Sequence, residues 1–302
     1  GGGPIGCELA QAFVRLGSEV TMVVRSQLIP KEDEDVAEQV TAQFQQDGIR
    51  LLEHSSIMEL QQEAGTKTVV VSINDSDAIT IECDHILLAI GRQANTEHIG
   101  LENVGVACND NGTVTVDDYL RTTCPTIYAC GDVAGPYQFT HVASHQAWYA
   151  AVNALFGSFK KFKVDYSVIP WVTFSDPEVA RVGLSEKEAH ANNIAYEVTK
   201  YGIDDLDRAI ADNEAHGFVK VLTVPGKDKI LGVTIVGYHA SELIAEYILA
   251  MRHGLGLNKV MGTIHIYPTL SEANKYVAGE WKKAHKPEGL LQWVEKFHAW
   301  RR

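Results

Sequence analysis

The spacing of apolar residues predicts an α/β unit at the start of the chain. Residues 7–16 carry apolar side chains at helical spacing directly after a cluster of glycines, and residues 19–24 form a β-branched run typical of a parallel strand. An acidic segment from Lys31 predicts a second helix to about residue 47, which Gly48 would end. Helices and strands in alternation, opened by glycines, predict a Rossmann-like arrangement.

The pattern changes twice further along the chain. In the first part we also expect short strands at 49–52, 69–73 and 79–83 and a buried strand at 85–90. The less regular middle part has a turn at 109–112, a strand at 113–116, an apolar run at 126–130 and a helix at 141–156. The last part has strands at 171–174, 218–224 and 230–236 and an amphipathic helix at 241–253. The expected fold class is therefore α/β followed by α+β with an antiparallel sheet.

Composition and charge narrow the function classes. The formal net charge of -13 argues against a general nucleic-acid binder, and no apolar run approaches the length of a membrane span. The five cysteines have no zinc-ligand spacing, and we interpret them as reduced thiols of a cytoplasmic protein. They are Cys7, Cys83, Cys108, Cys124 and Cys130. We expect no metal site in the chain.

Gly1, Gly3 and Gly6 fit the pattern G-x-G-x-x-G, which holds the pyrophosphate of a dinucleotide. The first glycine permits a tight bend, the second lets backbone N–H groups approach the phosphates, and the third allows close packing of helix and strand. The helix start adds a positive dipole end. A purely structural glycine turn is the alternative, but the strand at 19–24 favours nucleotide binding.

The strand that should lead into this loop has no counterpart, because Gly1 is the first residue. A Rossmann unit begins with a strand, and the loop follows the carboxyl end of that strand. We therefore expect the chain to be the later part of a longer protein. A complete protein with an unusual start is the alternative.

The end of the strand at 19–24 bears on the choice of nucleotide. An acid commonly stands there and binds the adenosine ribose, but this chain has Val24 followed by Arg25. Guanidinium binds phosphate well, and Lys31 would add a second positive charge. The sequence thus favours NADP(H) over NAD(H), with a solvated arginine as the alternative.

A second nucleotide signal lies at residues 126–132, where an apolar run ends in Gly131-Asp132 and a helix soon begins. The carboxylate of Asp132 would accept hydrogen bonds from sugar hydroxyls, and the helix start would face a phosphate or a flavin ring. Taken alone, Gly-Asp is also a common turn.

Four stretches occur in an order that resembles a known family. They are residues 1–6, 89–96 (A-I-G-R-Q-A-N-T), 126–132 and 265–272 (H-I-Y-P-T-L-S-E). Together they resemble the class I pyridine nucleotide–disulfide oxidoreductases, flavoenzymes that include glutathione reductase, dihydrolipoamide dehydrogenase and mercuric reductase. The resemblance spans nearly the whole chain and favours a mercuric reductase-like or dihydrolipoamide dehydrogenase-like member.

The resemblance implies three domains and two cofactors. Residues 1–91 would be an NAD(P)-binding domain without its first strand, residues 92–165 the C-terminal part of an FAD-binding domain, and residues 166–302 a dimerisation domain. The implied protein is a homodimer that transfers hydride from NADP(H), or NAD(H), to FAD and then reduces a small-molecule disulfide or thiol-reactive substrate.

The resemblance also assigns site residues. Glu8 matches an acid beside the nicotinamide that pairs with a lysine of the flavin half, although a first-turn acid favoured by the helix dipole is the alternative. Asp132 matches the aspartate on the ribityl chain of FAD, and residues 141–143 the helix start at the flavin edge. The implied cofactor-binding residues are Gly1, Gly3, Gly6, Glu8, Arg25, Lys31, Gly91, Asp132, His141, Val142 and Ala143.

Tyr267 and Glu272 are the catalytic candidates, because they match the acid–base pair that the family contributes to the other subunit. Three departures matter here. Tyr267 stands where the dithiol enzymes have their histidine, and His265 matches a second histidine that is not the base. None of the five cysteines matches the family's C-x-x-x-x-C pair, which belongs to the flavin half. No cysteine follows Cys130, whereas mercuric reductases end in a cysteine pair.

The expected function is therefore FAD-dependent NAD(P)H:disulfide oxidoreduction, with the redox disulfide supplied by the N-terminal half. One alternative is a non-catalytic fragment that binds nucleotide and dimerises. Another is a flavoprotein of the NAD(P)H oxidase or transhydrogenase type, which needs neither the disulfide nor the histidine.

Overall fold

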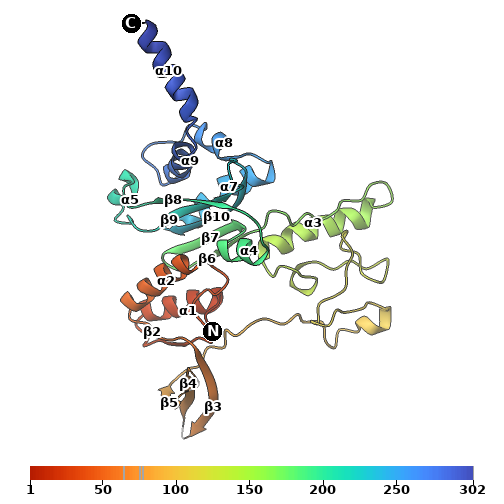
Figure 1. The fold of residues 1–302 in the computed structure, drawn as a ribbon. Helices are drawn as coiled ribbons and strands as arrows, with labels where there is room; N and C mark the ends of the chain where they lie inside the picture. The colour runs from red at the N-terminus through yellow and green to blue at the C-terminus, as the bar shows by residue number, and fades with distance from the viewer. Residues whose placement is uncertain (64, 75, 77, 302) are drawn as a thin grey trace. The chain divides into compact units, whose positions relative to one another are not determined.

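The computed structural model describes residues 1–63, 65–74, 76 and 78–301 (Figure 1). The chain divides into two compact units, one formed by Gly1–Ile90 together with Pro170–Arg302 and the other by Gly91–Ile169. The mixed α/β and α+β fold class is confirmed, because helices and both parallel and antiparallel sheets are present. The division into three domains stays a prediction.

The N-terminal part of the first unit combines a small parallel sheet with an antiparallel one. Its elements are α1 (Pro4–Arg15), β1 (Thr21–Val23), α2 (Glu34–Gln46), β2 (Arg50–Leu52), β3 (Ser55–Glu63), β4 (Thr66–Ile73) and β5 (Ala78–Cys83). β1 pairs in parallel with β2, as expected for a βαβ unit, and β3, β4 and β5 form an antiparallel sheet. Cys7, Val36 and Phe44 are fully buried in the core between α1, α2 and β1.

The C-terminal part of the first unit is built on an antiparallel sheet in the order β6-β7-β10-β9-β8. Its strands are β6 (Pro170–Thr173), β7 (Glu178–Gly183), β8 (Glu197–Gly202), β9 (Phe218–Thr223) and β10 (Ile230–Gly237). Its helices are α4 (Glu186–Ala191), α5 (Asp207–Ala211), α6 (Ala240–Leu243), α7 (Ala245–Arg252), α8 (Leu257–Met261), α9 (Glu272–Ala284) and α10 (Glu288–Arg301). Figure 1 shows α1 and α2 next to β6 and β7, and Val179, Phe218 and Val236 belong to the same core as α1 and α2.

The second unit has little regular structure. Its elements are the 3₁₀ helices η1 (Leu101–Val104) and η2 (Gly131–Val133) and the helix α3 (Thr140–Phe156). Side-chain hydrogen bonds hold the loops in place of a sheet. The Asn153 amide donates to the carbonyls of Tyr119 at 3.0 Å and Phe162 at 2.8 Å, and its oxygen accepts the amide of Phe162 at 2.7 Å.

Three expected strands differ from the structure. Residues 85–90 form no strand within the described part, and Leu88 is 67% exposed, so the prediction of a buried strand is wrong. A strand is stable only beside a partner that pairs its backbone groups, and no described strand pairs with residues 85–90. For the same reason, residues 113–116 and 126–130 make only isolated bridges.

The helix expected at 241–253 is interrupted at Ile244, which separates α6 from α7. The amide of Tyr247 donates to the Ile244 carbonyl three residues earlier, at 3.0 Å, and this tighter turn breaks the α-helical pattern.

Candidate functional site

The glycine loop leaves no room for a side chain at two of its three motif glycines. A Cβ atom at Gly1 would lie 2.3 Å from the carbonyl oxygen of Ala89, and one at Gly6 would lie 2.1 Å from the carbonyl oxygen of Gly1. At Gly3, by contrast, a Cβ atom would meet no described atom within 4 Å. α1 begins at Pro4 with Gly3 as its N-cap, and no described side chain caps it. The open face at Gly3 and the uncapped helix start form a cradle that suits a phosphate group.

The loop between β1 and α2 contains both basic residues expected at the adenosine end of the nucleotide. Val24 is buried, whereas Arg25 and Lys31 are exposed. The amide of Ile29 donates to the carbonyl of Gly2 at 2.7 Å, which fastens this loop to the glycine loop. Two cations are therefore exposed on a loop that is bonded directly to the phosphate cradle.

Glu8 lies in the second turn of α1 and points to the sheet of the same unit. Its Oε1 accepts a hydrogen bond from the amide of Phe174 at 2.9 Å. The first turn of α1 contains no acid, so the alternative of a first-turn acid is wrong: the helix begins at Pro4, which puts Glu8 one turn too far along. Burial raises the pKa of the neighbouring Cys7 thiol to about 12, which keeps it protonated and unreactive at neutral pH.

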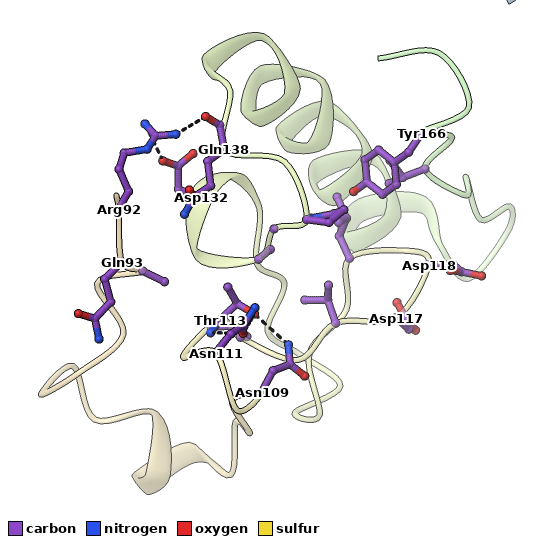
Figure 2. Close-up of a pocket in the computed structure, with 18 of the residues that line it drawn as sticks. Arg92, Gln93, Asn109, Asn111, Thr113, Asp117, Asp118, Asp132, Gln138 and Tyr166 are labelled. Atoms are coloured by element: carbon purple, nitrogen blue, oxygen red, sulfur yellow. Dashed lines mark hydrogen bonds and ion pairs between the residues drawn. The ribbon is translucent and has the colours of Figure 1, made fainter. Parts of the chain in front are cut away.

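The second unit contains an open cavity of about 730 Å³ (Figure 2). Arg92 and Asp132 lie at one end of it, with Nη1 and Oδ2 3.4 Å apart, and Arg92 also donates to the carbonyl of Gln138. Gly91 precedes this arginine with a φ of 138°, a conformation that favours glycine. The other polar lining residues are Gln93, Asn109, Asn111, Thr113, Asp117, Asp118, Lys163 and Tyr166.

A tight turn at Gly131 brings Asp132 beside the start of α3. Gly131 has a φ of 78°, and a Cβ atom there would lie 3.3 Å from the Cβ atom of Ala143. Gln146 is fully buried and fixes this turn, because it accepts the amide of Gly131 at 2.6 Å and donates to the carbonyl of Gly135 at 2.8 Å. The first turn of α3 holds the three residues assigned to the flavin edge: His141, Val142 and Ala143.

Tyr267 and Glu272 lie just before α9 and at its first residue. Tyr267 is 66% exposed, and its hydroxyl donates to the carboxylate of Asp207 at 2.7 Å, which raises the pKa of Tyr267. Glu272 is 8% exposed and accepts from the amide of Thr269 at 3.3 Å and the hydroxyl of Tyr276 at 3.2 Å. Each candidate therefore has its own partner, and Tyr267 is held as a protonated hydrogen-bond donor.

Both ring nitrogens of His265 also have polar partners. Its Nε2 lies 3.0 Å from both carboxylate oxygens of Glu246, and its Nδ1 lies 3.1 Å from the carbonyl oxygen of Thr263. Asn274 donates to the same glutamate at 2.9 Å. These contacts fix the orientation of the imidazole, and Asn274 on α9 holds the glutamate that the imidazole contacts.

The sequence alone did not single out Asp207, Arg181 or Lys220. Arg181 and Lys220 interrupt the apolar runs E-V-A-R-V-G and F-V-K-V-L-T, and both are buried. A cation in the middle of a buried strand is itself a signal, because such a charge requires partners. Asp207 gave no comparable signal, because it stands in a surface acidic segment.

Two family models match the chain. The pyridine nucleotide-disulphide oxidoreductase model matches residues 1–147, and the dimerisation-domain model of the same family matches residues 169–278. A dihydrolipoyl dehydrogenase of Chlamydia pneumoniae is 40% identical over 273 residues, which cover 90% of this chain and 58% of that protein. A mercuric reductase of Acidithiobacillus ferrooxidans is 35% identical over 278 residues, covering 92% and 49%.

Two solved structures are also similar to this chain in fold. The HOCl-induced flavoprotein disulfide reductase RclA from Escherichia coli matches with a TM-score of 0.83 and 27% identity, covering 92% of this chain and 63% of that one. LpdA from Mycobacterium tuberculosis matches with a TM-score of 0.83 and 29% identity, covering 91% and 59%.

These matches extend over both the nucleotide-binding part and the antiparallel sheet. The chain belongs to the pyridine nucleotide–disulphide oxidoreductase family. It spans 58% and 49% of the two curated relatives described above. Within the described residues, no helix is both long enough and apolar enough to cross a membrane.

Proposed function

We propose that this chain is the nicotinamide-nucleotide-binding and dimerisation portion of an FAD-dependent NAD(P)H:disulfide oxidoreductase. The proposed substrate is a small-molecule disulfide or another thiol-reactive compound, and the proposed compartment is the cytoplasm. Family membership supports the reaction class.

The glycine cradle carries the proposal. Gly1 and Gly6 are required by the backbone contacts of the loop itself, whereas Gly3 faces open space. A glycine without a packing reason, directly before an uncapped helix, allows a pyrophosphate to approach the backbone closely. Gly1 and Gly6 would therefore shape the loop, and the backbone at Gly3 would approach the two phosphates of the nucleotide.

Arg25 and Lys31 support NADP(H) as the preferred nucleotide. Both are exposed on the loop fastened to Gly2, and no carboxylate ends β1 where Val24 stands. A guanidinium group can bind a 2′-phosphate through two parallel hydrogen bonds. NAD(H) lacks that phosphate and would gain nothing from either cation.

The second unit provides groups that fit part of an FAD molecule. Asp132, at the end of the cavity, would accept hydrogen bonds from the ribityl hydroxyls, and the amides at the start of α3 would face the edge of the ring. Gln146, which lies on α3, fixes the turn before Asp132 to this helix by accepting the amide of Gly131. When bound, FAD supplies the two-electron carrier between the nicotinamide and a disulfide.

Tyr267 and Glu272 are proposed to serve the active site of the other subunit in a homodimer. The raised pKa of Tyr267 makes its hydroxyl a donor at neutral pH and a poor proton acceptor. Its proposed role is to exchange the bond to Asp207 for a hydrogen bond donated to a thiolate or to the departing sulfur of the substrate. Buried Glu272 would keep the segment from Thr269 in place through its bond to that amide.

Gly3→Ala tests the proposal directly. The backbone of Gly3 has φ -77°, which any residue can adopt, so the substitution should leave the fold intact and place a methyl group in the phosphate cradle. We expect NADPH binding to the 302-residue chain, followed by nucleotide fluorescence, to weaken at least about tenfold.

Gly279→Ala on α9 is the matched control, because its Cβ atom also meets no described atom within 4 Å. This variant should bind NADPH as tightly as the unsubstituted chain. Equal affinity in Gly3→Ala and the unsubstituted chain, or no binding by either, would contradict the proposed function.

A further inference from the structure

The loop between β1 and α2 is fixed at its far end by charged groups of the antiparallel sheet. Arg181 on β7 is 0% exposed, and its Nε lies 2.8 Å from Oε2 of Glu32, close enough for an ion pair though without hydrogen-bond alignment. Its Nη2 also donates to the carbonyl of Lys31 at 3.4 Å. The guanidinium lies over the ring of Trp171, 4.1 Å from its centre, and the indole N–H of Trp171 donates to Glu32 at 3.0 Å.

A second buried cation holds the next residues of the same segment. Lys220 on β9 is 1% exposed, and its ammonium lies 2.8 Å from Asp33, 2.7 Å from Asp35 and 2.9 Å from Glu186. The three carboxylates lie within 4.8 Å of one another, so the ammonium fills the space between them. Burial alone would lower the pKa of Lys220, but the hydrogen bonds to the carboxylates raise it, and the group stays charged.

Asp33 is held a second time by backbone groups at the start of α4. Its carboxylate oxygens accept the amides of Glu186 at 3.2 Å and Lys187 at 3.0 Å. Glu188, three residues after the N-cap of α4, pairs in turn with Arg181 at 2.6 Å. The end of the loop is thus joined to β7, β9 and α4 at once.

The near end of the loop is joined to the phosphate cradle. Ile29 donates to the carbonyl of Gly2, and the amide of Leu28 donates to Glu53 at 3.1 Å. A Cβ atom at Gly2 would lie 2.6 Å from Val24 and 2.8 Å from the carbonyl oxygen of Gln27, so the two loops are in direct contact. A shift at Glu32 or Asp33 would therefore move the residues that touch the glycine loop.

We propose that Arg181 and Lys220 are positioning residues of the nicotinamide-nucleotide site. By holding Lys31, Glu32 and Asp33, they fix the loop that presents Arg25 and Lys31 to the 2′-phosphate of NADP(H). The two cations touch no nucleotide; they determine the preference for NADP(H) over NAD(H) through the backbone of the loop. This inference rests on the proposed function of the glycine cradle.

The test compares Lys220→Met and Arg181→Met with Lys200→Met in the 302-residue chain. Lys200 is the matched control, because it pairs with Asp35 at 2.9 Å but is half-exposed and does not contact Asp33. NADPH and NADH fluorescence titrations give the two dissociation constants. We expect the two buried-site variants to weaken NADPH about tenfold and NADH less than about threefold, and Lys200→Met to change neither beyond about twofold.

Limited trypsin digestion provides a second readout that does not depend on nucleotide. Trypsin cleaves after Arg25 and Lys31, so release of the loop should speed cleavage at these two bonds in Lys220→Met and Arg181→Met. Lys220→Arg keeps the positive charge, and we expect it to restore most of the NADPH preference and the resistance to trypsin, even if the methionine variants fold poorly.

The outcomes separate the two proposals. Equal weakening of NADPH and NADH in Lys220→Met, with cleavage at Arg25 and Lys31 unchanged, would overturn the positioning role and leave the nucleotide site standing. Failure of the unsubstituted chain to bind either nucleotide would overturn the proposed function, and the positioning role with it.

Discussion

The two units of the chain fix their candidate site residues in different ways. In the first unit, the candidate nucleotide loop lies between strands and helices and is held by buried ion pairs at Arg181 and Lys220. In the second unit, the loops around the cavity depend on side-chain hydrogen bonds from Gln146 and Asn153, because the described residues there include one α-helix and isolated bridges.

This difference predicts how far the loss of stability spreads when one of these side chains is removed from each unit. Removing one charge from the first unit leaves another charge buried in a continuous core, so the whole unit should lose stability. Removing one amide from the second unit releases a single turn, so the loss should stay local.

The largest expected effect is that of Arg181→Met on the first unit. The substitution leaves Glu32 buried without its cation, and we expect it to lower the free energy of unfolding by about 3–5 kcal/mol. Urea unfolding followed by circular dichroism measures this. Arg15→Met should cost at most about 1 kcal/mol, because the ion pairs of Arg15 are partly exposed. Similar losses in both variants would remove the distinction between buried and exposed pairs.

A smaller effect is expected for Gln146→Ala in the second unit. The substitution removes the acceptor of the Gly131 amide and the donor to Gly135, which we expect to cost about 1–3 kcal/mol. Hydrogen exchange should speed up in residues 131–135 and stay unchanged in β9 and β10. His145→Ala, at an exposed neighbouring position, should change neither. Faster exchange throughout β9 and β10 would show that the loss is not local.

The smallest expected effect is a pH dependence of the stability of the first unit. Burial would raise the pKa of Asp33 and Asp35, but hydrogen bonds from Lys220, and from Lys200 to Asp35, outweigh it and lower both pKa values. The other charged group facing Lys220 is Glu186. A lowered folded-state pKa adds stability above the unfolded value of about 3.9 and loses it as the pH falls through the folded value.

Asp33→Asn should therefore be less stable than the unsubstituted chain at neutral pH, and the difference should shrink below about pH 4. Urea unfolding at pH 7 and pH 3 measures it. A difference that stays constant between the two pH values would show that Lys220 does not lower the pKa of Asp33.

The apolar pattern predicted the buried strands well and the exposed ones poorly. β9 and β10 lie within one residue of the predicted strands at 218–224 and 230–236, because both are apolar and buried. β3 was not predicted, since most of Ser55–Glu63 is polar and exposed and its strand conformation comes from pairing with β4. The strand at 85–90 was predicted from its apolar residues alone, but an apolar run without a pairing partner remains extended chain.

The site could be predicted as far as its motifs are local. Gly1, Gly3 and Gly6 are close in sequence, and the turn at Gly131 and Asp132 is read directly from its two residues. The partners of the candidate residues are remote: Lys220 and Asp35 are 185 residues apart, and Tyr267 and Asp207 are 60 apart. Such pairings depend on how distant segments pack together in the folded chain, which no single segment of sequence contains.

In the loop between β1 and α2, the residues that pack in the core differ from the residues that are exposed to solvent. Leu28 and Ile29 are buried and give the loop its shape, whereas Arg25 and Lys31 project from the surface. Substitutions at the two exposed positions would not disturb the packing of the loop. In the proposed nucleotide site, the preference between NADPH and NADH could therefore be changed at surface positions alone, while the buried residues keep the shape of the loop.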